Sequence, residues 1–298
     1  MIRRFLALAA TLPFLTTCCD SAYRIEQGEI LLRYRSKDDS LLVLEVEQGI
    51  GGSEDKAADA LQDALKGHRL YPPEGGFISL DFDKTRTVEP GKEQEHADFL
   101  ELARSVHVVD ARVFLDDLGR LSFLRLTRVA NFHRVLELVN AWTNRENAGV
   151  YDAARPFEPR YPVFDEQTRD AFRAASVSGH AWLHVEGEAI VLDVPMTPTN
   201  AAQCLAWLTK EARREGSADE PDWIGQVTSL EISKGHAIVR FGEAPREVVR
   251  FGGKSKQEPK DSAPICASLK DRGVAIGDWS ALSVAQAALG LAPPTKPK

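Results

Sequence analysis

The feature that most constrains the fold is a recurring unit of two apolar strands, a short polar turn between them, and a helix. In its first copy, strands at 30–35 and 41–47 flank a turn at 36–40, and Ser53 can cap the helix that follows. Later copies of the unit begin near three residues, Val106, His180 and Val227. Because turns this short join antiparallel neighbours, the pattern predicts antiparallel hairpins that each lead into a helix.

This order of elements predicts an α+β fold with antiparallel sheets and helices packed on one face. The other face of each sheet would then be free for solvent or a partner. Residues 154–163 contain three prolines, which favour an extended connector. The chain is therefore expected to form two α+β halves of similar size, 18–153 and 164–292, followed by a disordered tail at 293–298.

The first residues, MIRRFLALAATLPFLTTCC, have the composition of a secretion signal. Arg3 and Arg4 are followed by a mostly apolar core at 5–15 and then by small polar residues. A transmembrane helix needs ~20 apolar residues, so this core is too short to span a bilayer. Residues 1–17 are therefore predicted to be a signal peptide.

The four residues Leu15-Thr16-Thr17-Cys18 resemble the lipobox of bacterial lipoproteins. The resemblance implies that Cys18 is lipidated and becomes the first residue of the mature chain. It also implies a protein of the cell envelope that is attached to a bacterial membrane and faces the periplasm or the exterior. The alternative is cleavage by ordinary signal peptidase after Ala22.

The charge of the chain indicates which classes of partner it can bind. The net charge is −7, and removing Arg3 and Arg4 with the signal peptide makes the mature chain more acidic. An acidic chain without a basic stripe is not expected to bind nucleic acid or to dock electrostatically on anionic lipid. We therefore expect membrane attachment through the lipid and a protein partner in the envelope.

Two of the cysteines, Cys204 and Cys266, are candidates for a disulfide, because an envelope compartment is oxidising. The alternative is that both are buried apolar thiols. The sequence leaves both possibilities open.

The stretch FISLDFDKT, residues 77–85, resembles the nucleophile motif of the haloacid dehalogenase superfamily. The resemblance implies that Asp81 is the nucleophile, that Asp83 transfers the proton, and that both bind Mg²⁺. Ile276-Gly277-Asp278 resembles a later metal-binding motif of the same superfamily, which would add Asp278 to the metal site. This alternative makes the chain a Mg²⁺-dependent phosphohydrolase.

That superfamily is built on a parallel sheet, whereas the turns after Asp81 predict hairpins. The alternation of polar and apolar residues in FISLDFDKT is also typical of a half-buried strand. We therefore interpret the stretch as a strand, with no catalytic residue, no metal and no cofactor. Likewise, Asp116-Asp117 precedes Leu118-Gly119 between two apolar strands and is interpreted as a turn.

His180, Trp182 and His184 alternate along one predicted strand and so share a face. The two histidines lie ~13 Å apart on an extended strand, too far to bind one metal ion. One interpretation is an exposed patch that binds a partner, and the other is that a helix or the other half of the chain covers Trp182. The remaining histidines, including His236, show no ligand-like spacing.

Together these features predict a lipid-anchored envelope protein that acts as a non-catalytic binding or assembly module. A structural subunit without a small-molecule ligand would have the same sequence features. The phosphohydrolase that uses Asp81 and Asp83 is the alternative from a different class.

Overall fold

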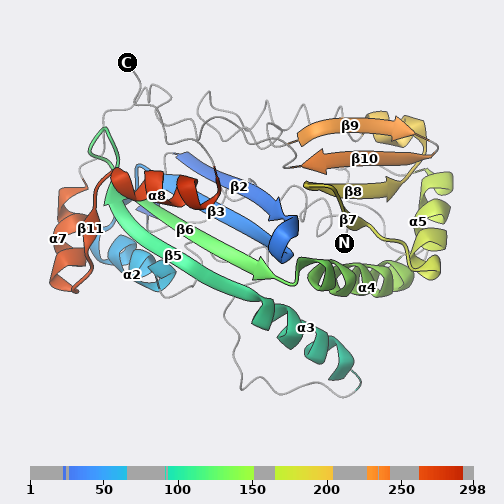
Figure 1. Cartoon of the computed structure of the whole chain (residues 1–298), viewed down its shortest axis with the longest axis horizontal. Helices are drawn as coiled ribbons and strands as arrows, with labels where there is room; N and C mark the ends of the chain where they lie inside the picture. The colour runs from blue at the N-terminus through green and yellow to red at the C-terminus, as the bar shows by residue number, and fades with distance from the viewer. Residues whose placement is uncertain are drawn as a thin grey trace.

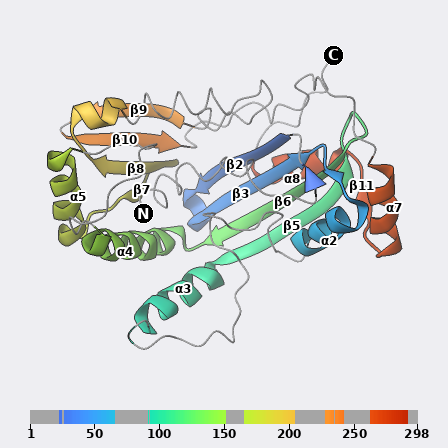
Figure 2. The same ribbon diagram turned by 180° about the vertical axis from the view of Figure 1, so that it is seen from behind.

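The computed structural model describes residues 23–24, 27–65, 91, 93–150, 165–203, 227–233, 235–241 and 262–290. Two larger sheets lie toward opposite ends of the long axis of the molecule (Figures 1 and 2). One has five strands and the other has four. We call them the large sheet and the small sheet.

The large sheet has the strand order β11-β5-β6-β3-β2. Its strands span Gln27–Arg35 (β2), Ser40–Gln48 (β3), Val106–Leu115 (β5), Leu121–Ala130 (β6) and Ile276–Gly277 (β11). Among the described strands, β11 pairs with β5 in parallel and all other pairs are antiparallel. Two short strands, Tyr23–Arg24 (β1) and Gly51–Gly52 (β4), pair separately, and a short 3₁₀ helix, Ser36–Asp38 (η1), connects β2 to β3.

The small sheet has the strand order β7-β8-β10-β9 and is antiparallel throughout. Its strands span Leu183–Glu186 (β7), Ala189–Pro195 (β8), Val227–Ser233 (β9) and His236–Phe241 (β10). Each larger sheet thus contains two of the four hairpins predicted from the sequence. The predicted α+β fold with antiparallel sheets is confirmed, in contrast to the parallel sheet that the resemblance to haloacid dehalogenases implies.

The turn between β5 and β6 shows how local sequence closes a hairpin. The carboxylate of Asp116 accepts hydrogen bonds from the backbone N–H groups of Leu118 and Arg120, at 2.9 and 2.8 Å. Its second oxygen pairs with the buried guanidinium of Arg120 at 2.8 Å. Gly119 has a φ of 74°, which favours glycine. The interpretation of Asp116-Asp117 as a turn is confirmed.

Helices cover both faces of the large sheet (Figures 1 and 2). They are Glu54–Leu65 (α2), Ala263–Asp271 (α7) and Ser280–Ala288 (α8). Phe123 and Leu124 are neighbours on β6 and therefore point to opposite faces. Phe123 belongs to the apolar cluster that includes α2 and α7, and Leu124 belongs to the cluster that includes α8. The helix α8 thus departs from the expected packing of all helices on one face.

A third apolar cluster joins the small sheet to the neighbouring end of the large sheet. Its helices are Glu93–Ser105 (α3), Phe132–Val150 (α4) and Glu166–Ser178 (α5). The cluster contains Phe172 from α5, Leu136 from α4, and Tyr34 and Leu41 from the large sheet. Trp182, which directly precedes β7, is fully buried in it. Residues 198–203 are also helical, and the Thr197 hydroxyl accepts a hydrogen bond from the Asn200 N–H at 3.2 Å, as expected of a helix cap.

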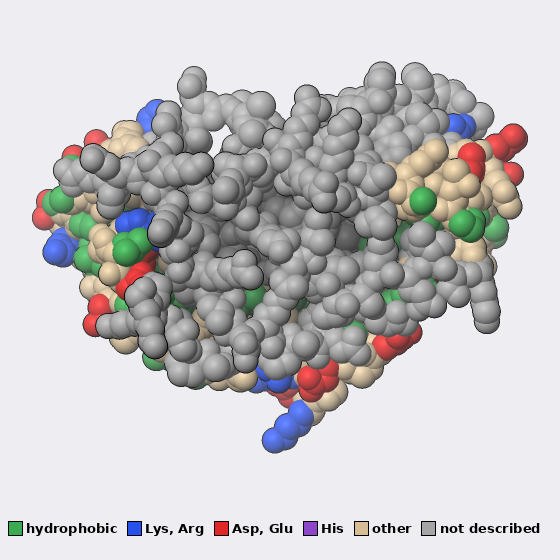
Figure 3. Space-filling view, turned by 90° about the horizontal axis from the view of Figure 1, so that it is seen from above, with side chains coloured by type: hydrophobic (Ala, Val, Ile, Leu, Met, Phe, Trp, Pro, Cys, Tyr) green, Lys and Arg blue, Asp and Glu red, His purple; other side chains and the backbone are tan. Residues whose placement is uncertain are grey.

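The surface of the described part is mixed in charge. Acidic and basic side chains are interspersed at both ends of the face that Figure 3 shows. No described helix combines the length and apolar character that crossing a bilayer requires. The connector predicted at 154–163 and the tail predicted at 293–298 lie outside the described residues, so both stay predictions.

Candidate functional site

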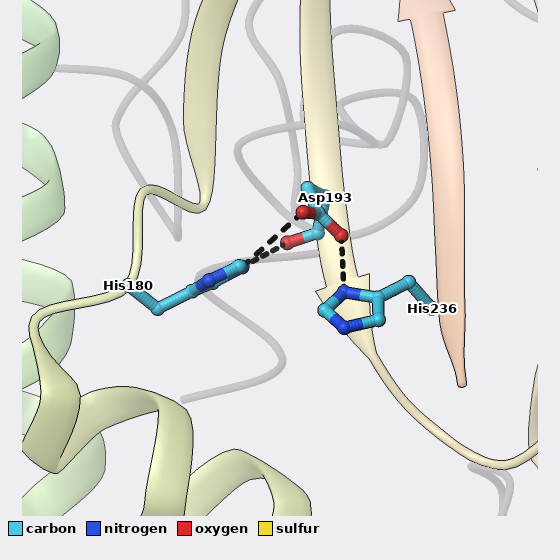
Figure 4. A group of neighbouring side chains, drawn as sticks. All are labelled: His180, Asp193 and His236. Carbon is cyan, nitrogen blue, oxygen red and sulfur yellow. Dashed lines mark hydrogen bonds and ion pairs between the residues drawn. The ribbon is translucent and has the colours of Figure 1, made fainter. Parts of the chain in front are cut away.

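Three side chains from separate segments converge beside the small sheet (Figure 4). His180 lies between α5 and β7, Asp193 lies on β8, and His236 is the first residue of β10. One nitrogen or oxygen atom from each residue lies within 4.8 Å of the others. We call this group the His-Asp-His site.

The end of α5 determines where His180 lies. Gly179 adopts a left-handed conformation with a φ of 74°, and its N–H donates to the carbonyl of Ser176 at 3.3 Å. The N–H of His180 donates to the carbonyl of Ala175 at 2.9 Å. This pattern is a Schellman-type helix end, in which glycine avoids the steric cost of the left-handed conformation. It directs the chain, and with it His180, toward the end of β8.

The register between β8 and β10 brings the other two residues together. His236 lies opposite Pro195, and Ile238 lies opposite Asp193. Side chains two positions apart on a strand point to the same face, so Asp193 and His236 are diagonal neighbours on one face of the sheet. A shift of one residue in this register would separate them.

Asp193 lies at the centre of the site and contacts both histidines. The Nδ1–H of His236 donates to Asp193 Oδ1 at 2.7 Å. The Nε2–H of His180 donates to the backbone carbonyl of Asp193 at 3.1 Å, and the same nitrogen lies 3.7 Å from Asp193 Oδ2. The two imidazole rings are 5.8 Å apart between centroids. The exposed fractions of the side chains are 17% for His180, 20% for Asp193 and 36% for His236, so solvent reaches the site.

A buried tryptophan packs against the side chain of His180. The ring of Trp182 lies edge-on to the His180 ring, with 5.0 Å between centroids. The indole N–H of Trp182 donates to the side-chain oxygen of Asn144 at 2.6 Å, and the Asn144 amide donates to the His180 carbonyl at 3.0 Å. Asn144 therefore fixes both the backbone of His180 and the indole against which its ring packs.

A second asparagine on α4 extends this support. Asn140 lies one turn before Asn144, so both side chains project from the same side of the helix. The Asn140 side chain accepts a hydrogen bond from the N–H of Leu183 at 2.9 Å and donates to the Leu183 carbonyl at 2.7 Å. These bonds satisfy the backbone groups of the first residue of β7, as buried polar groups require. The stretch that carries His180 is therefore held by side chains of α4.

The structure agrees only in part with the patch predicted from His180, Trp182 and His184. The interpretation of an exposed patch is wrong for Trp182, because α4 and α5 cover its side chain and leave it 0% exposed. The alternative, that a helix covers Trp182, is the one observed, since burial shields the large indole while Asn144 accepts its N–H. His184 lies on β7, and its Nε2–H donates to Glu186 at 3.2 Å.

The other predicted site residues are placed as follows. Asp278 lies at the start of α8 and accepts a hydrogen bond from the Ser280 N–H at 3.0 Å. The N–H and hydroxyl of Ser280 lower the pKa of the Asp278 carboxyl. Asp278 also lines a cavity of about 820 Å³ beside β11. The remaining residues of that metal prediction, Asp81 and Asp83, lie outside the described residues.

The cysteine predictions also stay open. Cys266 lies on α7, where its half-buried side chain packs against the apolar cluster that contains α2. Cys18 and Cys204 lie outside the described residues, so the lipid anchor and the disulfide remain predictions.

Sequence reasoning missed Asp193 and His236 as members of a site. The available signal was Asp193 itself, a charged residue within the apolar run IVLDVP. Such a residue inside a strand requires a polar partner. The sequence offered no means of identifying that partner, because His236 lies 43 residues away.

No family model, curated protein or solved structure matches this chain. The site is therefore interpreted from its own geometry.

Proposed function

We propose that the chain is a lipid-anchored, non-catalytic binding module of the bacterial cell envelope, held at a membrane through Cys18. The observation that carries the binding role is the convergence of His180, Asp193 and His236 at partly exposed positions. The anchor is supported by the signal-like segment 1–17 and the lipobox-like residues that end at Cys18.

The hydrogen bonds within the His-Asp-His site favour reversible binding. Without a ligand, Asp193 accepts hydrogen bonds from both histidines. A ligand can exchange these internal bonds for its own at a small net cost, because protein hydrogen bonds are worth only about 1 kcal/mol net. The antiparallel pairing of β8 with β10 and the asparagines of α4 hold the site in position beforehand, which lowers the entropy cost of binding.

The mainly antiparallel order of the described sheets, in which only β11 pairs in parallel, supports this proposal over the phosphohydrolase alternative, which implies a parallel sheet. The alternative retains one supporting observation, the position of Asp278 beside a cavity. Its carboxylate is already bonded to Ser280, as at the start of many helices.

Cell fractionation of a bacterium that expresses the full chain tests the anchor. We expect the wild-type chain in the membrane fraction, with a lipid-modified Cys18 in the mass spectrum of its N-terminal peptide. Cys18→Ser should move the chain to the soluble fraction or leave its signal peptide uncleaved. Cys19→Ser is the matched control and should stay lipidated. An unmodified mature terminus at Ser21 or Tyr23 would contradict the anchor.

Hydrolysis of a generic phosphate ester with added Mg²⁺ tests the non-catalytic part of the proposal. We expect no turnover above the rate without protein. Turnover that disappears in Asp81→Asn, while the variant stays folded, would replace the binding module with the phosphohydrolase.

A further inference from the structure

We infer that His180, Asp193 and His236 form a binding site for one divalent transition-metal ion of the Zn²⁺ type. This inference names a ligand class for the His-Asp-His site and so rests on the binding role proposed above. Two imidazole nitrogens and one carboxylate oxygen are a donor set suited to Zn²⁺ and its neighbours in the first transition row.

The separations between the donor atoms are close to those that a bound ion needs. Ligand atoms at ~2.0–2.1 Å from a tetrahedral Zn²⁺ lie ~3.3 Å from one another. His180 Nε2 and Asp193 Oδ2 are already 3.7 Å apart. His236 Nδ1 lies nearer to Asp193, at 2.7 Å from Oδ1, because a shared hydrogen lies between them. Small side-chain rotations are therefore sufficient to admit the ion.

The protonation change that binding needs is also small. A neutral imidazole carries its proton on one of its two nitrogens and coordinates through the other. Binding would place the proton of His180 on Nδ1 and that of His236 on Nε2, so each ring shifts its proton without changing its charge. The ion then replaces the two hydrogen bonds to Asp193, one from each histidine, and the carboxylate contributes the negative charge.

The surroundings of His180 resemble the support that metal ligands usually have. Groups outside the first ligand shell orient the ligands and raise metal affinity. Trp182 packs against the His180 ring, and Asn144 bonds both residues. These contacts exist without an ion, so the ligands need little rearrangement when an ion binds.

Three protein ligands leave at least one coordination position of a tetrahedral ion open. His236, with an exposed fraction of 36%, is the most exposed of the three ligands, so solvent can reach an ion bound here. A water molecule can occupy the position, and a side chain of an envelope partner can replace it. Assembly with the partner would then depend on the bound ion.

Zinc titration of the full chain, solubilised in detergent and purified without a polyhistidine tag, tests the site. After treatment with a chelator, we expect one Zn²⁺ per chain by competition with a chromophoric chelator. His180→Ala, Asp193→Ala and His236→Ala should each weaken the affinity by tenfold or more. His184→Ala is the matched control, because this imidazole lies on the adjacent strand and bonds Glu186, and it should leave the affinity unchanged.

Three outcomes would overturn the site. The first is a folded wild-type chain that binds no Zn²⁺, and the second is Zn²⁺ binding that survives all three substitutions. The third is an affinity that falls equally in His184→Ala. Circular dichroism shows whether each variant is folded, and Asp193→Asn provides an isosteric second variant if Asp193→Ala does not fold. A chain that is lipidated at Cys18 but fails this titration would leave the anchor intact and refute the metal site alone.

Discussion

The two larger sheets both contain charged side chains, but the surroundings of these side chains differ. In the large sheet, the guanidinium of Arg125 is buried and pairs with Glu45 from the neighbouring strand, with 2.6 Å between Nε and Oε2. Glu47 lies two residues after Glu45 on β3. Its Oε2 atom is shielded from solvent and has no hydrogen-bond partner among the described residues. In the small sheet, Asp193 and His236 remain partly exposed and bond each other.

This difference separates a structural use of charge from the binding use that we propose for the His-Asp-His site. Arg125 is buried and the Oε2 atom of Glu47 is shielded from solvent. Shielding a charge costs desolvation energy, so we expect the cluster in the large sheet to affect mainly stability and its dependence on pH. A partly exposed cluster loses less solvation and remains accessible to a ligand, so we expect the cluster in the small sheet to affect mainly the binding proposed above. Substitutions in the large sheet should therefore change stability alone, whereas substitutions around the His-Asp-His site should also change binding.

The largest effect is expected for Trp182→Ala. Removing this fully buried side chain should lower the free energy of unfolding by about 3–5 kcal/mol. Phe114→Ala removes a fully buried ring from the core of the large sheet and should cost a similar amount. Chemical denaturation measures both values. Only Trp182→Ala should also weaken Zn²⁺ binding, because only Trp182 packs against His180.

A pair of milder substitutions allows the same comparison if the alanine variants do not fold. Trp182→Phe retains most of the apolar contact but loses the hydrogen bond to Asn144. Phe114→Leu is the corresponding change in the large sheet. Equal losses of Zn²⁺ affinity in both variants would show that the two regions are not separate in function.

The second prediction concerns Glu47→Gln and the pH dependence of stability. Burial raises the pKa of Glu47 to about 8 from its ordinary value of 4.5, the nearby Glu45 carboxylate adds to the rise, and Arg125 opposes it. The folded state therefore holds a proton that the unfolded state releases above pH 4.5. This contribution to stability is present at acidic pH and is lost as the pH rises through about 8.

Glu47→Gln keeps the shape of the side chain but removes the titration. The variant should match the wild type near pH 4 and exceed its unfolding free energy by several kcal/mol near pH 9. Urea denaturation at several pH values measures the difference. Glu137→Gln, on the exposed surface of α4, is the control and should change stability little at any pH. A wild-type chain as stable at pH 9 as at pH 5 would contradict the raised pKa of Glu47.

The sequence predicted the hairpins and the helices that follow them because both depend on local order. Turn residues such as Asp116 and Gly119 and caps such as Thr197 act over a few residues, so their effect can be recognised without the fold. The way the last segment packs was not predicted. The helix α8 covers the second face of the large sheet, and nothing near residues 280–288 indicates which sheet they contact.

The His-Asp-His site depends on three long-range facts that local patterns do not contain. They are the register of β8 against β10, the direction in which α5 ends, and the asparagines of α4 that hold the stretch before β7. His180 was recognised as a candidate, but the sequence grouped it with Trp182 and His184 in a possible partner-binding patch. Spacing along one strand favoured His184, whereas the fold brings His236 to it from a different hairpin.

The smallest effect is expected for Gly179→Ala, which tests the helix end that positions His180. Gly179 and Gly119 have the same φ of 74°, and an added Cβ would meet no atom within 4 Å at either position. Alanine at each should therefore cost only the strain of a left-handed backbone, about 1–2 kcal/mol. Thermal denaturation of the two single variants should show nearly equal losses of stability.

The two glycine variants should differ in binding. Gly179→Ala should weaken Zn²⁺ affinity several-fold, because relief of the strained end of α5 displaces His180. Gly119→Ala changes a turn of the large sheet and should leave the affinity as in the wild type. If both variants lose stability equally and keep full Zn²⁺ affinity, the end of α5 does not position His180, and the register of β8 and β10 alone must account for the site.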